Sequence, residues 1–166
     1  MNALPDKLLV IAALRRELEE NIERAAARAE QARVDATHAE ARAENDKDTR
    51  GLETSYLARG QAMRTEELAE TLHRVRLLSP RTFTEDDPVG LGALVRTELE
   101  DGEARTFFLL DVAGGTELML APGEPSVWVV SPSSPVGRAL IGRSVGDEVK
   151  IARAGAMRHY DIVAIS

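Results

Sequence analysis

An apolar stripe with alternating steps of four and three residues runs through the first half of this 166-residue chain. Its members are Leu18, Ile22, Ala25, Ala29, Ala32, Ala36, Ala39 and Ala43. This alternation is typical of one long helix that packs along its length against a partner helix. The polar segment 45–51, which reads Asn-Asp-Lys-Asp-Thr-Arg-Gly, interrupts the stripe before helical spacing resumes. We therefore predict an antiparallel α-helical coiled-coil hairpin with carboxylates at its turn.

The sizes of the apolar residues support this fold-back. We expect the first helix from about Asp6 to Glu44, with large residues near its start and alanines farther on. The return helix, roughly 52–77, is small first and large last, with the inner stripe Ala58, Ala62, Thr65, Leu68 or Ala69, Leu72 and Val75. An antiparallel hairpin requires these opposite gradients, whereas a parallel homodimeric coiled coil does not. A hairpin also covers its own seam, so we expect a monomer.

Beyond Ser79-Pro80 the chain changes to short strand patterns with many prolines and glycines. We expect a hairpin of strands over 92–99 and 105–112, a strand at 127–130 and two closing strands at 148–152 and 159–165. Ser134 followed by Pro135 is typical of a capped helix, which Gly142 would end. The predicted fold class is α+β: a coiled-coil hairpin at 1–78, a linker at 79–90, and a small antiparallel β-sheet domain with one short helix at 91–166.

Composition excludes several classes of function. The chain has no cysteine, so disulfides, thiol catalysis and cysteine-ligated zinc are ruled out. Its formal net charge of −7 argues against binding nucleic acid by charge alone. The apolar run 8–14 is too short to span a bilayer. We expect a cytoplasmic protein with no membrane contact.

One long motif resembles a known family. The run 131–142, Ser-Pro-Ser-Ser-Pro-Val-Gly-Arg-Ala-Leu-Ile-Gly, followed by Val-Gly-Asp-Glu-Val at 145–149, is similar to a signature of the bacterial Gre transcript cleavage factors, the GreA/GreB-like family. Residues 92–111 resemble the first β-hairpin of the same domain, and the N-terminal hairpin resembles the family's coiled coil. The resemblance implies an FKBP-like fold for the C-terminal domain.

The resemblance also implies a role as a non-enzymatic partner of RNA polymerase. In that family the globular domain docks near the rim of the secondary channel, and the coiled-coil tip reaches the catalytic Mg²⁺, where polymerase itself cleaves backtracked RNA. Candidate partner-binding residues are therefore Ser134, Pro135, Arg138 and Arg143. The two arginines are also compatible with an ordinary surface, and the Ser-Pro steps with turns and a helix cap. No cofactor of the chain's own is implied, and contact with the RNA 3′ end would be indirect.

The tip departs from the family pattern, which reads aspartate, two variable residues, glutamate, asparagine, one variable residue, an acidic residue and tyrosine. Alignment on the helix start at 57–59 places Asp48 at the aspartate and Gly51 at the glutamate. Alignment on Glu44-Asn45 leaves Ala41 at the aspartate. Either alignment loses one of the two carboxylates.

Four acidic side chains remain candidates at the tip: Asp48, Asp46, Glu44 and Glu53. Asp48 and Asp46 are the candidate ligands for a Mg²⁺ shared with polymerase, because a two-metal site needs hard oxygen ligands for its labile ion. A solvated polar turn is the alternative interpretation of the same residues.

Three other functions stay open. A Gre-like factor with this altered tip could inhibit or regulate polymerase without cleavage. An FKBP-like domain could act as a chaperone or prolyl isomerase, although 4% aromatic residues is little for a ring-lined pocket. The hairpin could also be a scaffold that docks to another coiled coil.

Overall fold

The computed structural model describes residues 4–42, 49–99, 101–153 and 155–166, with side chains for these residues except 39–42, 49, 50 and 153. The chain forms two compact units. One unit contains residues 15–76, and the other joins the chain up to Leu14 with residues 77–166. We call them the hairpin unit and the globular unit.

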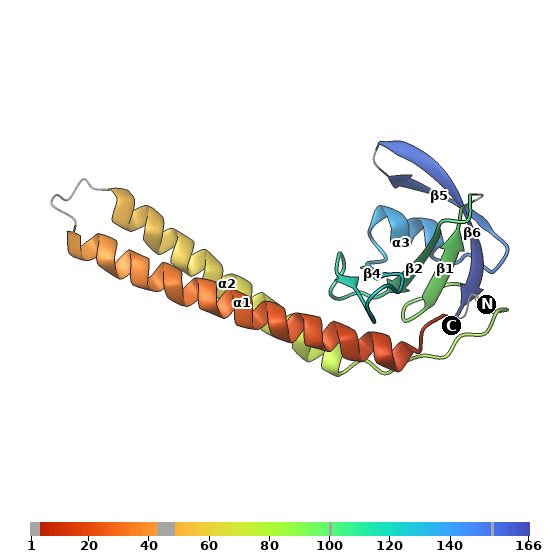
Figure 1. Cartoon of the computed structure of the whole chain (residues 1–166), viewed down its shortest axis with the longest axis horizontal. Coiled ribbons are helices and arrows are strands. Elements are labelled where there is room, and N and C mark those ends of the chain that lie inside the picture. Colours follow the sequence, from red (N-terminus) through yellow and green to blue (C-terminus); the bar gives the residue numbers. More distant parts are fainter. Residues whose placement is uncertain (1–3, 43–48, 100, 154) are drawn as a thin grey trace. The chain divides into compact units, whose positions relative to one another are not determined.

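Two antiparallel helices lie side by side in the hairpin unit (Figure 1). α1 spans Lys7–Arg42, of which residues 15–42 belong to this unit, and α2 spans Thr49–Arg76. The predicted hairpin is therefore confirmed. The start of α1 is set by Asp6, whose side-chain Oδ1 accepts the Leu8 N–H at 2.8 Å. This bond satisfies one of the amide groups that the first turn of a helix leaves unpaired.

The seam between the helices follows the predicted spacing on α1, where Leu18, Ala25, Ala32 and Ala36 are buried. On α2, Leu72 and Val75 are buried and Leu68 is half-buried, whereas Ala69 is exposed. Ala62 was expected in the seam and is exposed, and Gln61 takes that place. The observed α2 stripe runs 58, 61, 65, 68, 72 and 75, so the true step at this point is three residues instead of four.

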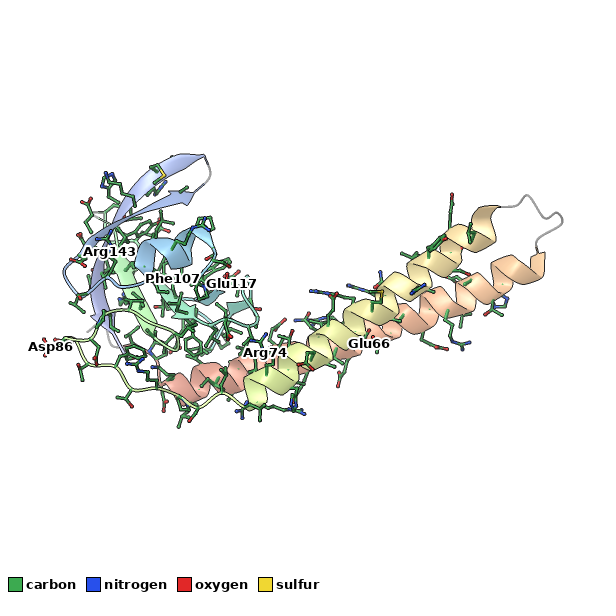
Figure 2. All side chains as sticks on the ribbon, turned by 180° about the vertical axis from the view of Figure 1, so that it is seen from behind. Glu66, Arg74, Asp86, Phe107, Glu117 and Arg143 are labelled. Carbon is green, nitrogen blue, oxygen red and sulfur yellow. The ribbon has the colours of Figure 1, made fainter. Side chains whose placement is uncertain are left out.

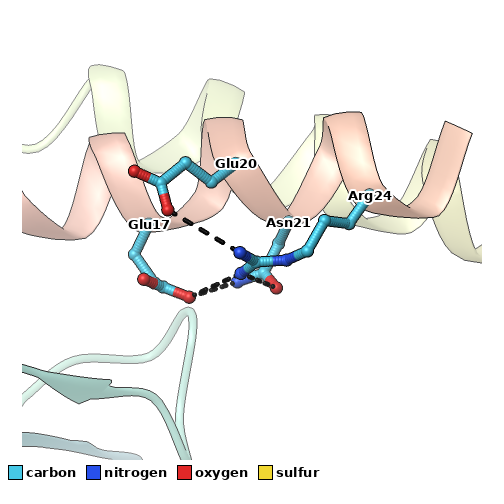
Figure 3. Close-up of polar contacts among 4 residues, drawn as sticks. All are labelled: Glu17, Glu20, Asn21 and Arg24. Atoms are coloured by element: carbon cyan, nitrogen blue, oxygen red, sulfur yellow. Dashed lines mark hydrogen bonds and ion pairs between the residues drawn. The ribbon is translucent and has the colours of Figure 1, made fainter. Parts of the chain in front are cut away.

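Several ion pairs lie on the exposed surface of the hairpin unit. On α1, the Arg24 guanidinium lies 3.1 Å from a Glu17 carboxylate oxygen and 3.7 Å from one of Glu20, and donates to the Asn21 amide oxygen (Figure 3). Between the helices, Arg76 Nη2 lies 2.8 Å from Glu19 Oε1. These charged side chains are 36–57% exposed, so each pair contributes at most about 1 kcal/mol. The buried seam therefore carries most of the hairpin's stability.

The globular unit contains one six-stranded sheet with the order β3-β4-β2-β1-β6-β5. Its strands are β1 Leu94–Glu98, β2 Ala104–Leu109, β3 Glu117–Leu118, β4 Val127–Val130, β5 Glu148–Arg153 and β6 Ala156–Ile165. The predicted strands are all present, and β3 is an additional two-residue strand.

The sheet is mixed, although an antiparallel one was expected. β2 and β4 pair in parallel, with Phe107 opposite Trp128, whereas the other four pairings are antiparallel. The difference arises because residues 110–126 carry the chain back across the sheet before β4 begins. Parallel neighbours need such a long crossover, and two-residue turns cannot supply it.

A short helix, α3 at Pro135–Leu140, packs on this sheet. Leu140 joins Phe107, Tyr160 and Ile162 in the buried core. Figure 2 shows Phe107 inside the globular unit, whereas Asp86 and Arg143 lie at its surface. In the described ranges, neither long helix is apolar enough to cross a membrane.

Candidate functional site

The Ser-Pro run forms a helix cap that its own side chains hold in place. Ser134 is the N-cap of α3: its Oγ accepts the Gly137 N–H at 3.0 Å and donates to the main-chain oxygen of Ser131 at 2.7 Å. Pro135 occupies the first turn, where no amide hydrogen is required. The cap predicted from the sequence is therefore present, and it ties residues 131–134 to the helix.

Two glycines let the chain approach this turn closely. A Cβ placed on Gly137 would overlap the main-chain oxygen of Ser131. A Cβ on Gly114 would lie 3.3 Å from Ser131 Cβ and from Ser131 N. Ser131 is thus enclosed between α3 and the loop that follows β2. A larger residue at Gly137 would displace the turn, and one at Gly114 would be tightly packed against Ser131. The side-chain hydrogen bonds of Ser134 fix the turn on α3.

The partner-binding candidates differ in what they contact. The side chain of Ser134 is used by the cap, and Arg138 donates from Nη1 to the main-chain oxygen of Ser133. Pro135 is exposed beside them. Arg143 lies beyond α3, where its main-chain oxygen accepts the Val89 N–H at 2.7 Å, and its side chain is exposed. Pro135, Arg138 and Arg143 therefore present an exposed, positively charged edge around a fixed turn.

The hairpin tip is described only in part. Three of the candidate tip carboxylates, Glu44, Asp46 and Asp48, lie outside the described residues. Glu53 is described, and its side chain is exposed on the second turn of α2. Near it Leu52 and Tyr56 are also exposed, at 57% and 66%. In the described part of the chain no three His, Cys, Asp or Glu side chains gather as a metal site would require.

Sequence reasoning missed two contributors to the α3 edge. Ser131 supplies the oxygen that receives the Ser134 hydroxyl, and Gly137 supplies the space for it. Both residues belong to the motif at 131–142, but their contact depends on how the turn folds. A glycine inside a six-residue helix, where it lowers helix propensity, was the available signal.

Comparison with known proteins places this globular unit in a functional class. Residues 84–166, half of the chain, match the family described as "Transcription elongation factor, GreA/GreB, C-term". This segment contains all six strands and α3. Within the globular unit, residues 84–166 are thus a domain of the GreA/GreB C-terminal type. The chain belongs to the GreA/GreB family.

Curated relatives agree with this assignment. The transcription elongation factor GreA of Rhodospirillum rubrum is 30% identical over 102 residues, which are 61% of this chain and 60% of the relative. GreA of Sulfurovum sp. is 29% identical over 119 residues, 72% of this chain and 64% of the relative. The matches therefore span less than two thirds of each relative's length.

Two solved structures show a distant similarity to this chain. The GreA factor homolog 1 (Gfh1) of Thermus thermophilus is 24% identical, with 92% of this chain and 94% of that chain covered and a TM-score of 0.37. A GreA/GreB elongation factor from Nitrosomonas europaea is 23% identical, with 60% of this chain and 78% of that chain covered and a TM-score of 0.36.

Proposed function

We propose that this chain binds RNA polymerase and acts on elongation through the enzyme's secondary channel. Membership of the GreA/GreB family supports the partner. The observation that carries the proposal is the edge around α3, where a fixed turn presents Pro135, Arg138 and Arg143 to solvent. A preorganised turn loses little conformational entropy on docking, and exposed arginines are frequent at protein interfaces.

The hairpin unit suits the second part of this role. Its alanine seam keeps the two helices close, so the rod is narrow. The part of α1 that belongs to this unit, residues 15–42, extends over 28 residues, or about 42 Å. A narrow helical rod can enter a channel that a globular domain cannot. We propose that the segment between its two helices, residues 43–48, lies next to the catalytic Mg²⁺ of polymerase.

The acidic residues of the turn fit this position chemically. Asp46 and Asp48, together with Glu44 or Glu53, supply carboxylate oxygens, the ligand type that Mg²⁺ takes in proteins. In two-metal hydrolysis the ions stabilise the attacking and leaving oxygens. The chain is then an accessory factor that contributes ligands, and polymerase cleaves the backtracked RNA.

A second function is favoured by the tip sequence. One of the two family carboxylate positions carries Gly51 or Ala41, depending on the alignment. The first acidic residue of α2 is Glu53, whose side chain is exposed. A tip with one carboxylate fewer holds a labile cation more weakly. The same docking would then inhibit or regulate polymerase without cleaving RNA.

Stalled elongation complexes with Mg²⁺ separate the two functions. Cleavage predicts short 3′ RNA fragments when the chain is added, and a loss of at least tenfold in fragment yield for Asp48→Asn. Regulation predicts slower RNA synthesis without fragments. If Asp48→Asn binds polymerase normally and releases fragments at the wild-type rate, Asp48 has no role in cleavage.

Docking is tested by binding to polymerase. We expect Arg143→Ala, combined with Arg138→Ala, to weaken binding at least tenfold. Lys150→Ala removes an exposed positive charge from β5 of the same unit and serves as the matched control. Equal losses for the control and the double variant would contradict an interface at α3.

A further inference from the structure

Residues 52–63 of α2 carry an apolar stripe that does not take part in the seam of the hairpin. Its members, Leu52, Tyr56 and Met63, are 57%, 66% and 53% exposed. Steps of four and seven residues place these side chains on one face of the helix. Gln61, which lies in the seam with α1, is about 180° from Leu52 around the helix axis. The stripe therefore faces solvent on the side of α2 opposite to the seam.

The stripe has the composition of a protein interface. Arg59 lies on the same face between Tyr56 and Met63, and it forms no ion pair with any residue that the structure describes. Tyrosine, methionine and arginine are enriched at protein interfaces, whereas glutamate is depleted there. Further along α2 this face continues with Glu66, labelled in Figure 2, and Glu70. The interface-like part is thus confined to about 17 Å of the helix.

The size of the stripe argues against a second copy of the chain as its partner. Its three side chains expose on the order of 300 Å², whereas a stable protein–protein complex buries about 800 Å² on each partner. A patch of this size adds affinity where the molecule is already held at another surface, because the second contact then forms within one complex. The proposed docking of the α3 edge supplies such a surface.

Single-stranded RNA is a poorer match than a polypeptide. A tyrosine and an arginine can stack on bases, but a nucleic-acid groove also needs a net positive charge along the backbone. Residues 52–67 contain two arginines against three glutamates, and one of the arginines, Arg64, pairs with Glu67 at 3.4 Å. Leu52 and Met63 offer no ring for a base to stack on. An apolar polypeptide surface therefore complements the stripe better.

We propose that this stripe docks onto an apolar wall of the RNA polymerase secondary channel, with a carboxylate of polymerase opposite Arg59. The inference rests on the function proposed above and adds a contact between the α3 edge and the catalytic centre. In the alignment that places Asp48 at the family's aspartate, Leu52 takes the place of the family's asparagine. The contact is thus a property of this chain. It would fix the rotation of the hairpin about its own axis within the channel.

Two leucines of α2 provide a matched test by binding of the full chain to polymerase. Leu52 and Leu57 are both 57% exposed, but Leu57 lies about 140° away around the helix. Glutamine removes the apolar side chain and retains helix propensity. We expect Leu52→Gln to weaken binding severalfold, the double variant with Met63→Gln at least tenfold, and Leu57→Gln less than twofold. Circular dichroism checks that each variant keeps its helices. Equal losses for the two leucine variants, or normal binding by the double variant, overturn the proposal.

Photo-crosslinking in the same complex identifies what covers the stripe. Met63→p-benzoylphenylalanine should crosslink to a polymerase subunit, with a yield at least fivefold above that of the same side chain at position 57. Crosslinks from position 63 to RNA or to a second copy of the chain overturn the proposal. If the wild-type chain does not bind polymerase, the proposed function fails and the stripe loses its partner with it. If wild type and the double variant bind equally, the proposed function stands and the docking of the stripe alone is wrong.

Discussion

Gly137 lies directly against Ser131, so close that a Cβ on the glycine would overlap the main-chain oxygen of the serine. This contact brings the turn at 131–134 onto α3 and allows Ser134 to cap the helix. We expect Gly137→Ala to lower the free energy of unfolding of the globular unit by about 1–3 kcal/mol, because either the turn or the helix must move. Urea unfolding followed by the fluorescence of Trp128, the only tryptophan, measures the change.

Gly60→Ala is the matched control for this substitution. Gly60 lies in α2, and a Cβ there would meet no atom within 4 Å. Alanine should stabilise the hairpin by about 0.5–1 kcal/mol, as it does in exposed helix interiors. If both glycine variants stabilise the protein, the close contact at Ser131 does not restrict the turn.

Ala113 has a backbone conformation that favours glycine, with φ at 55°. It lies in the loop that encloses Ser131 from the other side, one residue before Gly114. We expect Ala113→Gly to stabilise the globular unit by about 0.5–1 kcal/mol, since the steric cost of a left-handed alanine exceeds the added chain entropy of glycine. Gly115 has φ at 91° and gives the opposite comparison. Gly115→Ala should lower the stability of the globular unit, because alanine is disfavoured at positive φ. Thermal unfolding of both variants gives the comparison, and a loss of stability in Ala113→Gly would contradict it.

Thr97 places a hydroxyl in the fully buried part of β1, where it has no hydrogen-bond partner among the described residues. Because a buried unpaired polar group costs about 1–3 kcal/mol, Thr97→Val should raise the free energy of unfolding by about 1 kcal/mol. Valine keeps the shape and the strand preference. Thr97→Ala, which also removes a methyl group, is the control and should not stabilise. A destabilised Thr97→Val variant would indicate that the hydroxyl has a bonded water.

Part of this architecture could be predicted from local patterns. The four-three spacing on α1 identified Leu18, Ala25 and Ala32 as seam residues because each step places a side chain on the same helix face. On α2 a polar residue, Gln61, occupies the seam, so hydrophobicity favoured its neighbour Ala62. Gln61 is only half-buried, so its seam position is compatible with a polar side chain that hydrophobicity does not predict there.

Local sequence patterns could not predict the contacts between residues that are distant in the sequence. The parallel pairing of β2 with β4 depends on the path of residues 110–126, and the two residues of β3 carry no periodicity. At the α3 edge the serine cap was predicted because it is local, whereas the contact of Gly137 with Ser131 was not. Lys7 illustrates the limit best, because its Nζ donates to oxygens of Arg81 and Ser166, which lie 74 and 159 positions away.

The seam and the surface of the hairpin should differ clearly in their effect on stability. Leu72 is only 6% exposed, and its truncation in Leu72→Ala should cost about 2–4 kcal/mol through lost burial and the cavity left behind. The Glu19–Arg76 pair, at 2.8 Å but about half exposed, should give a coupling energy below about 1 kcal/mol in a double-mutant cycle. Helicity at 222 nm during urea unfolding reports both. A coupling energy as large as the Leu72 effect would mean that the ion pair holds the helices together.

The depressed pKa of Lys7 predicts how stability depends on pH. Burial lowers this pKa to about 8 in the folded chain, against about 10.5 for an exposed lysine. Between these two values the unfolded chain binds more protons than the folded one, so the free energy of unfolding rises with pH. Below pH 8 both states are protonated, and the cost of burying the charge is fully present.

Since other groups also titrate in this range, the quantity to measure is the difference in unfolding free energy between wild type and Lys7→Met, at intervals from pH 7 to 10. Methionine keeps most of the aliphatic stem without the charge. We expect wild type to gain stability relative to Lys7→Met as the pH rises from 8 to 10. A difference that is constant or falls with pH would show that the hydrogen bonds to Arg81 and Ser166 stabilise the ammonium more than burial destabilises it.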